Sequence, residues 1–372
     1  MIFRINLEIA MINFAVGPVP SSDEVRALGG LDVPYFRTDE FSHTMLENEK
    51  MILELAAAPE GSRAVFSTSS GTGAMEAVVM GTLSPVNDKA LVVDGGTFGH
   101  RFVQLLGQHG IEHDVIKLEY GRPLSLKDLE SYRDGGYTAF LVNLGETSQG
   151  ILYDASLIGS FCEDQGLYLI VDGISSFLAD PFDMSRMGAD VLITDAQKAL
   201  ACPPGVAPII FSPRALNRIA SIKQPCTYFD LADLLKNQER GQTPFTPAVG
   251  VLLQIHARLT QIVRDGGSVV EVAHRAAVAD DFRNRIAEAD LPLEMRLESP
   301  SNAVTYLTTE GFSAKQLVSD MISTYGIWLC PNGGERADCS FRVGHIGEHP
   351  LSDNALLVAA LKDAQRRGLM NE

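Results

Sequence analysis

Short apolar runs recur along the first two thirds of the chain, and each ends in glycine, hydroxyl or carboxylate residues. Such runs, bounded by turn signals, are typical of buried strands in a parallel sheet. The runs that predict strands are 64–67, 91–94, 139–144, 168–171 and 191–194. Because helix-like segments separate them, the pattern predicts an α/β fold: a mostly parallel sheet with helices on both faces.

The pattern changes near residue 266. Before it, helical spacing of apolar residues predicts a long helix over 41–58, and another helix is expected from about Ala74. After it, a charged, helix-rich stretch to 291 is followed by the strand-like pieces AVTYLTT, GIWLCP and SFRVGHIG. We therefore expect a large domain that includes the N-terminal segment, over 1–265, and a smaller C-terminal α+β domain over 266–372.

Composition and charge limit the classes of function. The chain has 372 residues, of which 45% are hydrophobic, so it can bury a large core. Its 30 basic and 47 acidic residues give a net charge of −17, which disfavours binding to nucleic acid or an anionic membrane. No apolar run is long enough to span a bilayer. Arg4 and Glu8 also make the N-terminal stretch a poor signal peptide.

The cysteines favour a reducing, cytoplasmic environment. They are odd in number and scattered, and they lack metal-ligand spacing, so neither a disulfide framework nor a metal site is expected. They are Cys162, Cys202, Cys226, Cys330 and Cys339.

Two predicted strands end in side chains that together indicate a cofactor. Asp172 follows the run 168–171, and Lys198 follows the run 191–194. The carboxyl ends of parallel strands meet at one edge of the sheet, where α/β folds bind ligands. A desolvated lysine amine forms Schiff bases, and pyridoxal phosphate (PLP) needs such an amine and an acid that keeps its ring nitrogen protonated. Taken alone, Asp172 would be better explained as a turn acid and Lys198 as a solvated lysine, but the pair favours PLP.

Other strand ends carry weaker signals. Ser70, Gly71 and Thr72 precede a helix, where backbone N–H groups and hydroxyls can bind a phosphate. Phe98 follows two glycines and can stack on a flat ring, while Thr147 offers a hydroxyl at the same sheet edge. A tight turn of small residues and a core phenylalanine are the structural alternatives.

Two further segments bear on the site. Arg342 lies between apolar neighbours on a short strand, and it is a candidate clamp for a carboxylate or phosphonate, with a surface arginine as the alternative. The segment NFAVGPVP, residues 13–20, reads as a connector before a helix capped by Ser21 or Ser22.

The ordered motifs carry a family resemblance over nearly the whole chain. The motifs are SSGTGAMEAV, GTFGHRF, GETSQG, VDGISS, DAQKAL, PFTPAV and SFRVGHIG. Together they resemble the class V aminotransferases of the fold-type I PLP enzymes, most closely the branch with 2-aminoethylphosphonate–pyruvate and alanine or serine–glyoxylate transaminases. The segments ADCSFRVGHIGE and VDGISSF lean towards the phosphonate enzymes. Gln197 stands where cysteine desulfurases of this class have histidine, which disfavours that activity.

The resemblance implies a role for each candidate around the cofactor ring. Lys198 would form the Schiff base with PLP and later move the substrate's α-proton. Asp172 would pair with the ring nitrogen, Phe98 would stack on the ring, and Thr147 would contact the ring substituents.

The resemblance also implies a phosphate site, a substrate site and a homodimer. Arg342 would bind the acidic group of the substrate. The residues implied for the phosphate are Ser70, Gly71, Thr72, Gln197 and, from the neighbouring subunit of a homodimer, Thr246.

We therefore expect a PLP-dependent aminotransferase. The donor would be small, either similar to 2-aminoethylphosphonate or alanine or serine, and the acceptor would be a 2-oxo acid such as pyruvate or glyoxylate. One alternative is a PLP-dependent lyase that eliminates ammonia from a substituted aminophosphonate or amino acid. The other is a non-catalytic binding protein with the PLP fold.

Overall fold

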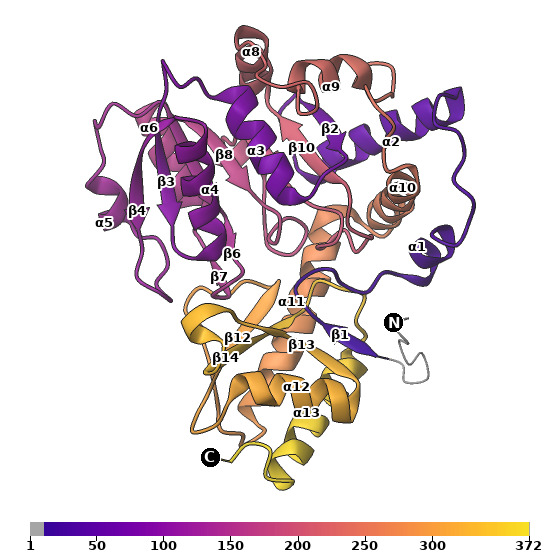
Figure 1. The fold of residues 1–372 in the computed structure, drawn as a ribbon, viewed down its shortest axis with the longest axis vertical. Coiled ribbons are helices and arrows are strands. Elements are labelled where there is room, and N and C mark those ends of the chain that lie inside the picture. Colours follow the sequence, from indigo (N-terminus) through magenta and orange to yellow (C-terminus); the bar gives the residue numbers. More distant parts are fainter. Residues whose placement is uncertain (1–10, 372) are drawn as a thin grey trace.

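The computed structural model of the protein describes residues 11–371 and shows a large and a small domain, each with its own sheet, one above the other in Figure 1. Residues 1–10, which form most of the stretch predicted to be a poor signal peptide, lie outside the described residues. Within residues 11–371, no helix is both long and apolar enough to cross a bilayer.

The large domain is built on one sheet. In the described part of the chain its strands are, in spatial order, β2 (Arg63–Ser67), β10 (Ala207–Phe211), β9 (Val191–Ile193), β8 (Tyr168–Asp172), β5 (Ala139–Asn143), β3 (Lys89–Asp94) and β4 (Glu112–Lys117). The strands from β9 to β4 pair in parallel, and β10 runs antiparallel to both of its neighbours. The five strands predicted from apolar runs are all present, which confirms the α/β fold class.

Helices cover both faces of this sheet, as its apolar strands require. Alternate strand residues enter two cores; Leu141 and Ile170 belong to one, and Val142 and Val171 to the other. The first core is closed by α3 (Gly71–Thr82), α4 (Thr97–Gln108), α8 (Pro213–Ser221) and α9 (Leu231–Gln238). The second is closed by α2 (Asp39–Leu55), α6 (Ala155–Gln165), α7 (Met184–Met187) and α10 (Val249–Arg264).

Two helix boundaries differ from those predicted. Helix α3 begins at Gly71 rather than near Ala74, because the Ser70 hydroxyl caps it by accepting the Gly73 N–H. Helix α2 ends at Leu55 rather than at residue 58, since Ala57 has a φ of +48°, a left-handed value that ends a helix. The cap of α1 (Asp23–Leu28) is Ser22, one of the two predicted.

Short elements connect the main ones. A small hairpin, β6 (Gly145–Glu146) and β7 (Ile151–Leu152), follows strand β5. Helix α5 (Leu126–Glu130) lies between β4 and β5 and carries a capping box of Ser125 and Asp128.

The small domain has its own sheet and core. Its strands, in spatial order, are β1 (Ile12–Phe14), β13 (Ile327–Pro331), β14 (Ser340–Gly344), β12 (Val304–Thr309) and β11 (Leu293–Met295). The helices that pack on it are α11 (Gly267–Ala287), α12 (Ala314–Tyr325) and α13 (Leu351–Arg366), with a 3₁₀ turn η1 (Gly334–Arg336) between β13 and β14. Strand β1 pairs in parallel with β13, so the N-terminal segment contributes to this sheet. The predicted domain boundary at 265/266 stays a prediction.

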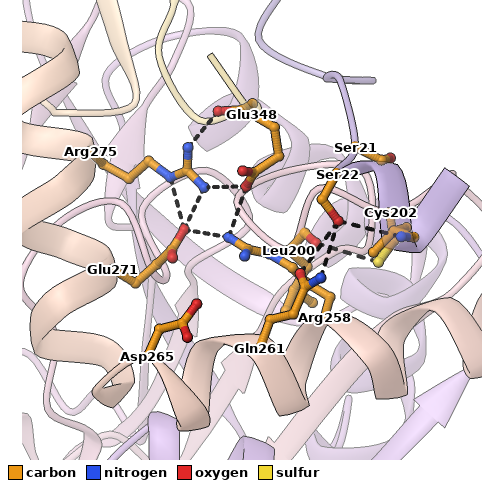
Figure 2. A network of polar contacts seen from close by, with 12 residues as sticks. Ser21, Ser22, Leu200, Cys202, Arg258, Gln261, Asp265, Glu271, Arg275 and Glu348 are labelled. Carbon is orange, nitrogen blue, oxygen red and sulfur yellow. Dashed lines mark hydrogen bonds and ion pairs between the residues drawn. The ribbon is translucent and has the colours of Figure 1, made fainter. Parts of the chain in front are cut away.

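A buried ion network lies where the two domains meet (Figure 2). Arg258 of α10 contacts Glu271 of α11 at 2.6 Å and Glu348, which precedes α13, at 3.2 Å. Arg275 of α11 contacts the same two carboxylates, at 2.5 and 3.0 Å, and its side chain is fully buried. Because a buried charge is costly without a partner, the shared pairs fix α10, α11 and the chain before α13 relative to one another.

Candidate active site

A cavity of about 160 Å³ lies at the carboxyl edge of the large sheet. It is roomy enough for a small organic molecule, because one water occupies only about 30 Å³ of liquid volume. Of the residues predicted for the site, those that line this cavity are Ser70, Gly71, Thr72, Phe98, Thr147, Asp172, Gln197 and Lys198. The topology explains the gathering, since β8 and β9 are parallel neighbours that deliver Asp172 and Lys198 to one edge.

Lys198 lies deep in the site. Its Nζ donates a hydrogen bond to the backbone carbonyl of Val16 over 2.8 Å. Burial lowers the pKa of Lys198, although the nearby carboxylate of Asp195 opposes this effect. The shift favours the neutral amine, which is the nucleophilic form.

Asp172 lies at the end of β8 and is 5% exposed. Its Oδ1 accepts the Ile174 N–H over 2.8 Å, which holds the carboxyl group in place. Burial raises the pKa of Asp172 to about 7. A protonated ring nitrogen placed opposite would stabilise its ionised form by charge pairing.

The N-terminal end of helix α3, at residues 70–72, lines one side of the cavity together with Gln197. We call these residues the helix-end cradle. Ser70 caps the helix, and the side chain of Gln197 approaches it from the loop before Lys198. Asp195 occupies the centre of this cradle, since its Oδ2 accepts both the Gly71 N–H and the Gln197 Nε2–H over 2.6 Å. The Oε1 of Gln197 is buried and has no hydrogen-bond partner among residues 11–371.

Phe98 and Thr147 border the cavity from neighbouring elements. Phe98 lies in the first turn of α4, and the guanidinium of Arg101, three residues on, lies 5.4 Å from its ring centroid. Arg101 also donates to the Thr72 hydroxyl over 2.8 Å, so it links α4 to the helix-end cradle. Thr147 is buried, and its hydroxyl donates to the Gly145 carbonyl over 3.5 Å.

Arg342 comes from the small domain and reaches the same region. Its Nη1 donates to the Thr147 carbonyl over 3.2 Å, and its Nη2 donates to the Pro331 carbonyl over 2.9 Å. Its positive charge contributes to lowering the pKa of Lys198. The Nε of Arg342 is buried without a partner in the described part of the chain.

Thr246 lies apart from the cavity of its own chain. It is exposed and follows Phe245, whose ring stacks on Tyr228 at 5.6 Å between centroids. A separate pocket near Thr68 includes Thr246. Of the predicted residues, then, Thr246 is the one that the single chain does not bring towards Lys198.

Sequence reasoning missed several residues that contribute to the site. The segment 13–20, read as a connector, supplies the Val16 carbonyl to Lys198, and only its glycine and prolines hinted at a special conformation. Arg101 was detectable, because residues three apart on a helix share a face and Phe98 was already a candidate. Asp195 and Ser175 also line the cavity, and each lies three residues from a predicted site residue.

The residues of the cavity fit PLP. A buried amine, a buried acid, an aromatic face and a helix N-terminus are the groups that this cofactor requires. The Gly71 N–H and the Gln197 Nε2–H, which Asp195 accepts, are hydrogen-bond donors of the kind that a phosphate engages.

Comparisons with known proteins agree with this chemistry. The family described as aminotransferase class-V matches residues 35–288. The chain is 29% identical to an L-aspartate–glyoxylate aminotransferase of Paracoccus denitrificans over 90% of this chain and 86% of the relative. It is 30% identical to a 2-aminoethylphosphonate–pyruvate transaminase of Syntrophobacter fumaroxidans over 94% of this chain and 95% of that protein.

A solved structure shows the same fold. The crystal structure of an alanine–glyoxylate aminotransferase from Nostoc sp. superposes with a TM-score of 0.89 at 22% identity, covering 96% of each chain. The fold, the family match and the relatives confirm a transaminase whose cofactor is pyridoxal phosphate. The chain therefore belongs to the class V aminotransferases.

Proposed function

We propose that this aminotransferase moves an amino group from a small acidic donor to glyoxylate or pyruvate, and that Arg342 binds both substrates in turn by their acid group. The observation that carries the proposal is the hydrogen bond from Arg342 to the backbone carbonyl of Thr147, which lines the same cavity as Lys198. An arginine fork binds a planar carboxylate with two parallel hydrogen bonds, which orients the rest of a small substrate. Because Nε is already buried without a partner in the described chain, a substrate oxygen there would satisfy it.

The residues around the cofactor take distinct roles in this proposal. PLP, when bound, withdraws electrons from the bond at the substrate's α-carbon. Asp172 would keep the ring nitrogen protonated, and Phe98 would pack on the ring. Lys198 would hold the cofactor through its amine, and as a free amine it would be the base that takes the substrate's α-proton.

The environment of Lys198 suits both of its tasks. Burial lowers its pKa, so more of the amine is neutral near physiological pH than for a solvated lysine. The Val16 carbonyl, 2.8 Å away, gives the Nζ hydrogen a partner and so fixes the direction of the amine. The positive charge of Arg342 further disfavours the ammonium form until an anionic substrate arrives to offset it.

The names of two relatives support glyoxylate or pyruvate as the acceptor. Glyoxylate stands in the name of the Paracoccus relative and pyruvate in that of the Syntrophobacter relative. Both acceptors are short 2-oxo carboxylates, so a single arginine can bind either of them. The donor is a small amino acid or aminophosphonate, and a place in phosphonate metabolism follows only for the latter.

The proposed enzyme acts as a homodimer in the cytoplasm. Two exposed aromatic side chains lie near Thr246, and exposed apolar surface of this kind favours a protein interface. They are Phe245, which precedes Thr246, and Tyr228, whose ring stacks on that of Phe245. A second subunit on this surface would bring its Thr246 towards the helix-end cradle of the first. The five cysteines are free, which suits a reducing compartment.

A substrate panel tests the proposal. Purified protein is supplied with alanine, serine, aspartate or 2-aminoethylphosphonate, each with glyoxylate, with pyruvate or without an acceptor. We expect the amino group to appear on the acceptor, no ammonia to be released, and the Lys198→Ala variant to be inactive. Ammonia release from a donor alone would instead establish the lyase, which the named relatives do not favour.

A further inference from the structure

Asp195 holds the hydrogen-bond donors that the proposed site assigns to the cofactor phosphate. Its Oδ2 accepts the Gly71 N–H and the Gln197 Nε2–H, each over 2.6 Å. Its Oδ1 accepts the Ala196 N–H over 3.1 Å, which anchors the carboxyl group to its own loop. An anionic ligand that accepts hydrogen bonds from the same two N–H groups would have to lie where this carboxylate now lies.

The packing around Asp195 leaves little freedom for it to turn away. The residue is 2% exposed. A Cβ placed on Gly71 would lie 2.8 Å from Oδ2 and 2.5 Å from Cδ1 of Ile174, so the helix end and the carboxylate are already in close contact. A phosphate bound to this helix end would therefore have Asp195 as an immediate neighbour.

Two anions this close in a buried site destabilise each other. A phosphate monoester carries about 1.5 to 2 negative charges near neutral pH, and a like charge nearby makes a buried carboxyl group retain its proton. Burial already raises the pKa of Asp195, while its hydrogen bonds to Gly71 and Gln197 and the charge of Lys198 act in the opposite sense.

We propose that Asp195 takes up a proton when the cofactor phosphate binds, so that its carboxyl group donates a hydrogen bond to the phosphate instead of repelling it. The proposal rests on the proposed phosphate site. In this step one proton passes from solvent to the Asp195 carboxylate, and no bond between heavy atoms changes. It follows that the affinity for the cofactor falls as the pH rises.

Other charged groups share the cavity and have to be separated from Asp195. They are Lys198, Asp172 and Arg101. Lys198 stabilises the ionised form of Asp195, so a fixed ion pair between these two is the competing account. Pyridoxamine phosphate forms no Schiff base with Lys198, and pyridoxamine lacks the phosphate, so this pair of ligands isolates the phosphate contribution.

The experiment measures dissociation constants of both ligands for the full-length protein, freed of cofactor by dialysis. Wild type and Asp195→Asn are compared from about pH 6.5 to about pH 8.5, with unfolding temperatures recorded for each. We expect wild type to lose affinity for pyridoxamine phosphate relative to the variant by up to about tenfold per pH unit, the limit for one linked proton. Pyridoxamine should show no such divergence. Asp180→Asn, which removes another buried carboxylate outside the cavity, should follow wild type.

The results separate the proposal for Asp195 from the proposed phosphate site. Parallel pH profiles for wild type and Asp195→Asn, or equal weakening of both ligands in the variant, would overturn the proposal in favour of a fixed ion pair. If Asp195→Asn does not fold, Asp195→Ser, whose hydroxyl also donates, gives the same comparison. Gln197→Ala tests the phosphate site itself. If this variant leaves the preference for pyridoxamine phosphate over pyridoxamine unchanged, the site assignment fails, whatever Asp195 does.

Discussion

The side-chain amine of Lys198 and the backbone carbonyl of Val16 are joined by a hydrogen bond of 2.8 Å, although 182 residues separate them in sequence. Val16 follows strand β1, which belongs to the sheet of the small domain. The lysine of the large domain is thereby held by a segment anchored in the small one. Movement between the domains would alter the position of the reactive amine.

Gly17 gives the most direct test of this contact. A Cβ at Gly17 would lie 2.6 Å from the Lys198 Nζ, so Gly17→Ala has to displace the amine. We expect kcat/KM to fall by at least about tenfold, a loss of about 1.4 kcal/mol of transition-state stabilisation. The absorbance of the cofactor–lysine Schiff base should change as well.

Gly205→Ala is the matched control for Gly17→Ala. Gly205 has a φ of +129° against +133° for Gly17, so both variants place alanine in the same positive-φ region. The nearest atom to a Cβ at Gly205 is Cγ2 of Val251, 4.0 Å away. Gly205→Ala should therefore lower the unfolding temperature alone, and equal losses of activity in both variants would contradict the role of the Val16 segment.

Asp172 should make the stability of the cofactor-free protein depend on pH. Burial raises its pKa to about 7, whereas an unfolded aspartate titrates near about 3.9. Between these values the native state keeps a proton that the unfolded chain has released, so stability falls as pH rises. The fall is about 1.4 kcal/mol per pH unit and ends above about pH 7.

Asp172→Asn isolates this effect, because the amide stays neutral while its oxygen can still accept the Ile174 N–H. The free energy of unfolding should be measured with urea at several pH values. Relative to wild type, that of the variant should rise by roughly 3 to 4 kcal/mol between about pH 4 and about pH 7. Stability profiles that stay parallel across this range would show that Asp172 is already ionised in the native state.

Arg342→Gln should weaken both half-reactions to a similar degree. Loss of a bidentate charged pair costs about 3 kcal/mol, so kcat/KM for donor and acceptor should each fall about 10²-fold. Arg342→Lys should recover little of this loss, because an ammonium group cannot form the two parallel bonds. Arg336→Gln removes the same charge from an exposed neighbouring position and is the control. If only one substrate is affected, the acid groups do not share a site.

The ion network of Figure 2 should be sensitive to its shared carboxylate. Glu271→Gln weakens the pairing of Arg258 and of the fully buried Arg275, and breaking such a pair costs about 3 to 5 kcal/mol. The exposed pair Arg264–Asp265 offers a control, since Arg264→Gln should cost about 0 to 1 kcal/mol. Both values come from denaturant unfolding, and similar costs for the two variants would mean that the network contributes little.

The sequence predicted those parts of the site that follow a strong local signal. Asp172 and Lys198 end apolar runs, and a parallel sheet necessarily brings neighbouring strand ends together. The strand β4 was not predicted, because Glu112, His113 and Asp114 interrupt its apolar pattern at the sheet edge. Edge strands carry such charged residues because these prevent pairing with further strands. The same residues break the apolar pattern from which strands are predicted.

Contacts between distant segments left no such signal. The pairing of Ile12 with Ile327 and the bond from Lys198 to Val16 depend on how the two domains pack, which no local spacing encodes. Asp195 follows a predicted strand, but no local pattern indicates its hydrogen bonds to Gly71 and Gln197. These bonds depend on how the loop after β9 packs against helix α3. These contacts therefore depend on long-range packing, which the sequence motifs alone do not indicate.

The parallel pairing of β1 with β13 also sets the order in which the enzyme can be completed during synthesis. Ile12 is synthesised before the large domain, yet its partner Ile327 follows only after that domain has been made. Domains usually fold as units while the chain is still growing. The large domain can thus fold with its lysine in place, while the Val16 carbonyl reaches that lysine in one of the last steps of maturation.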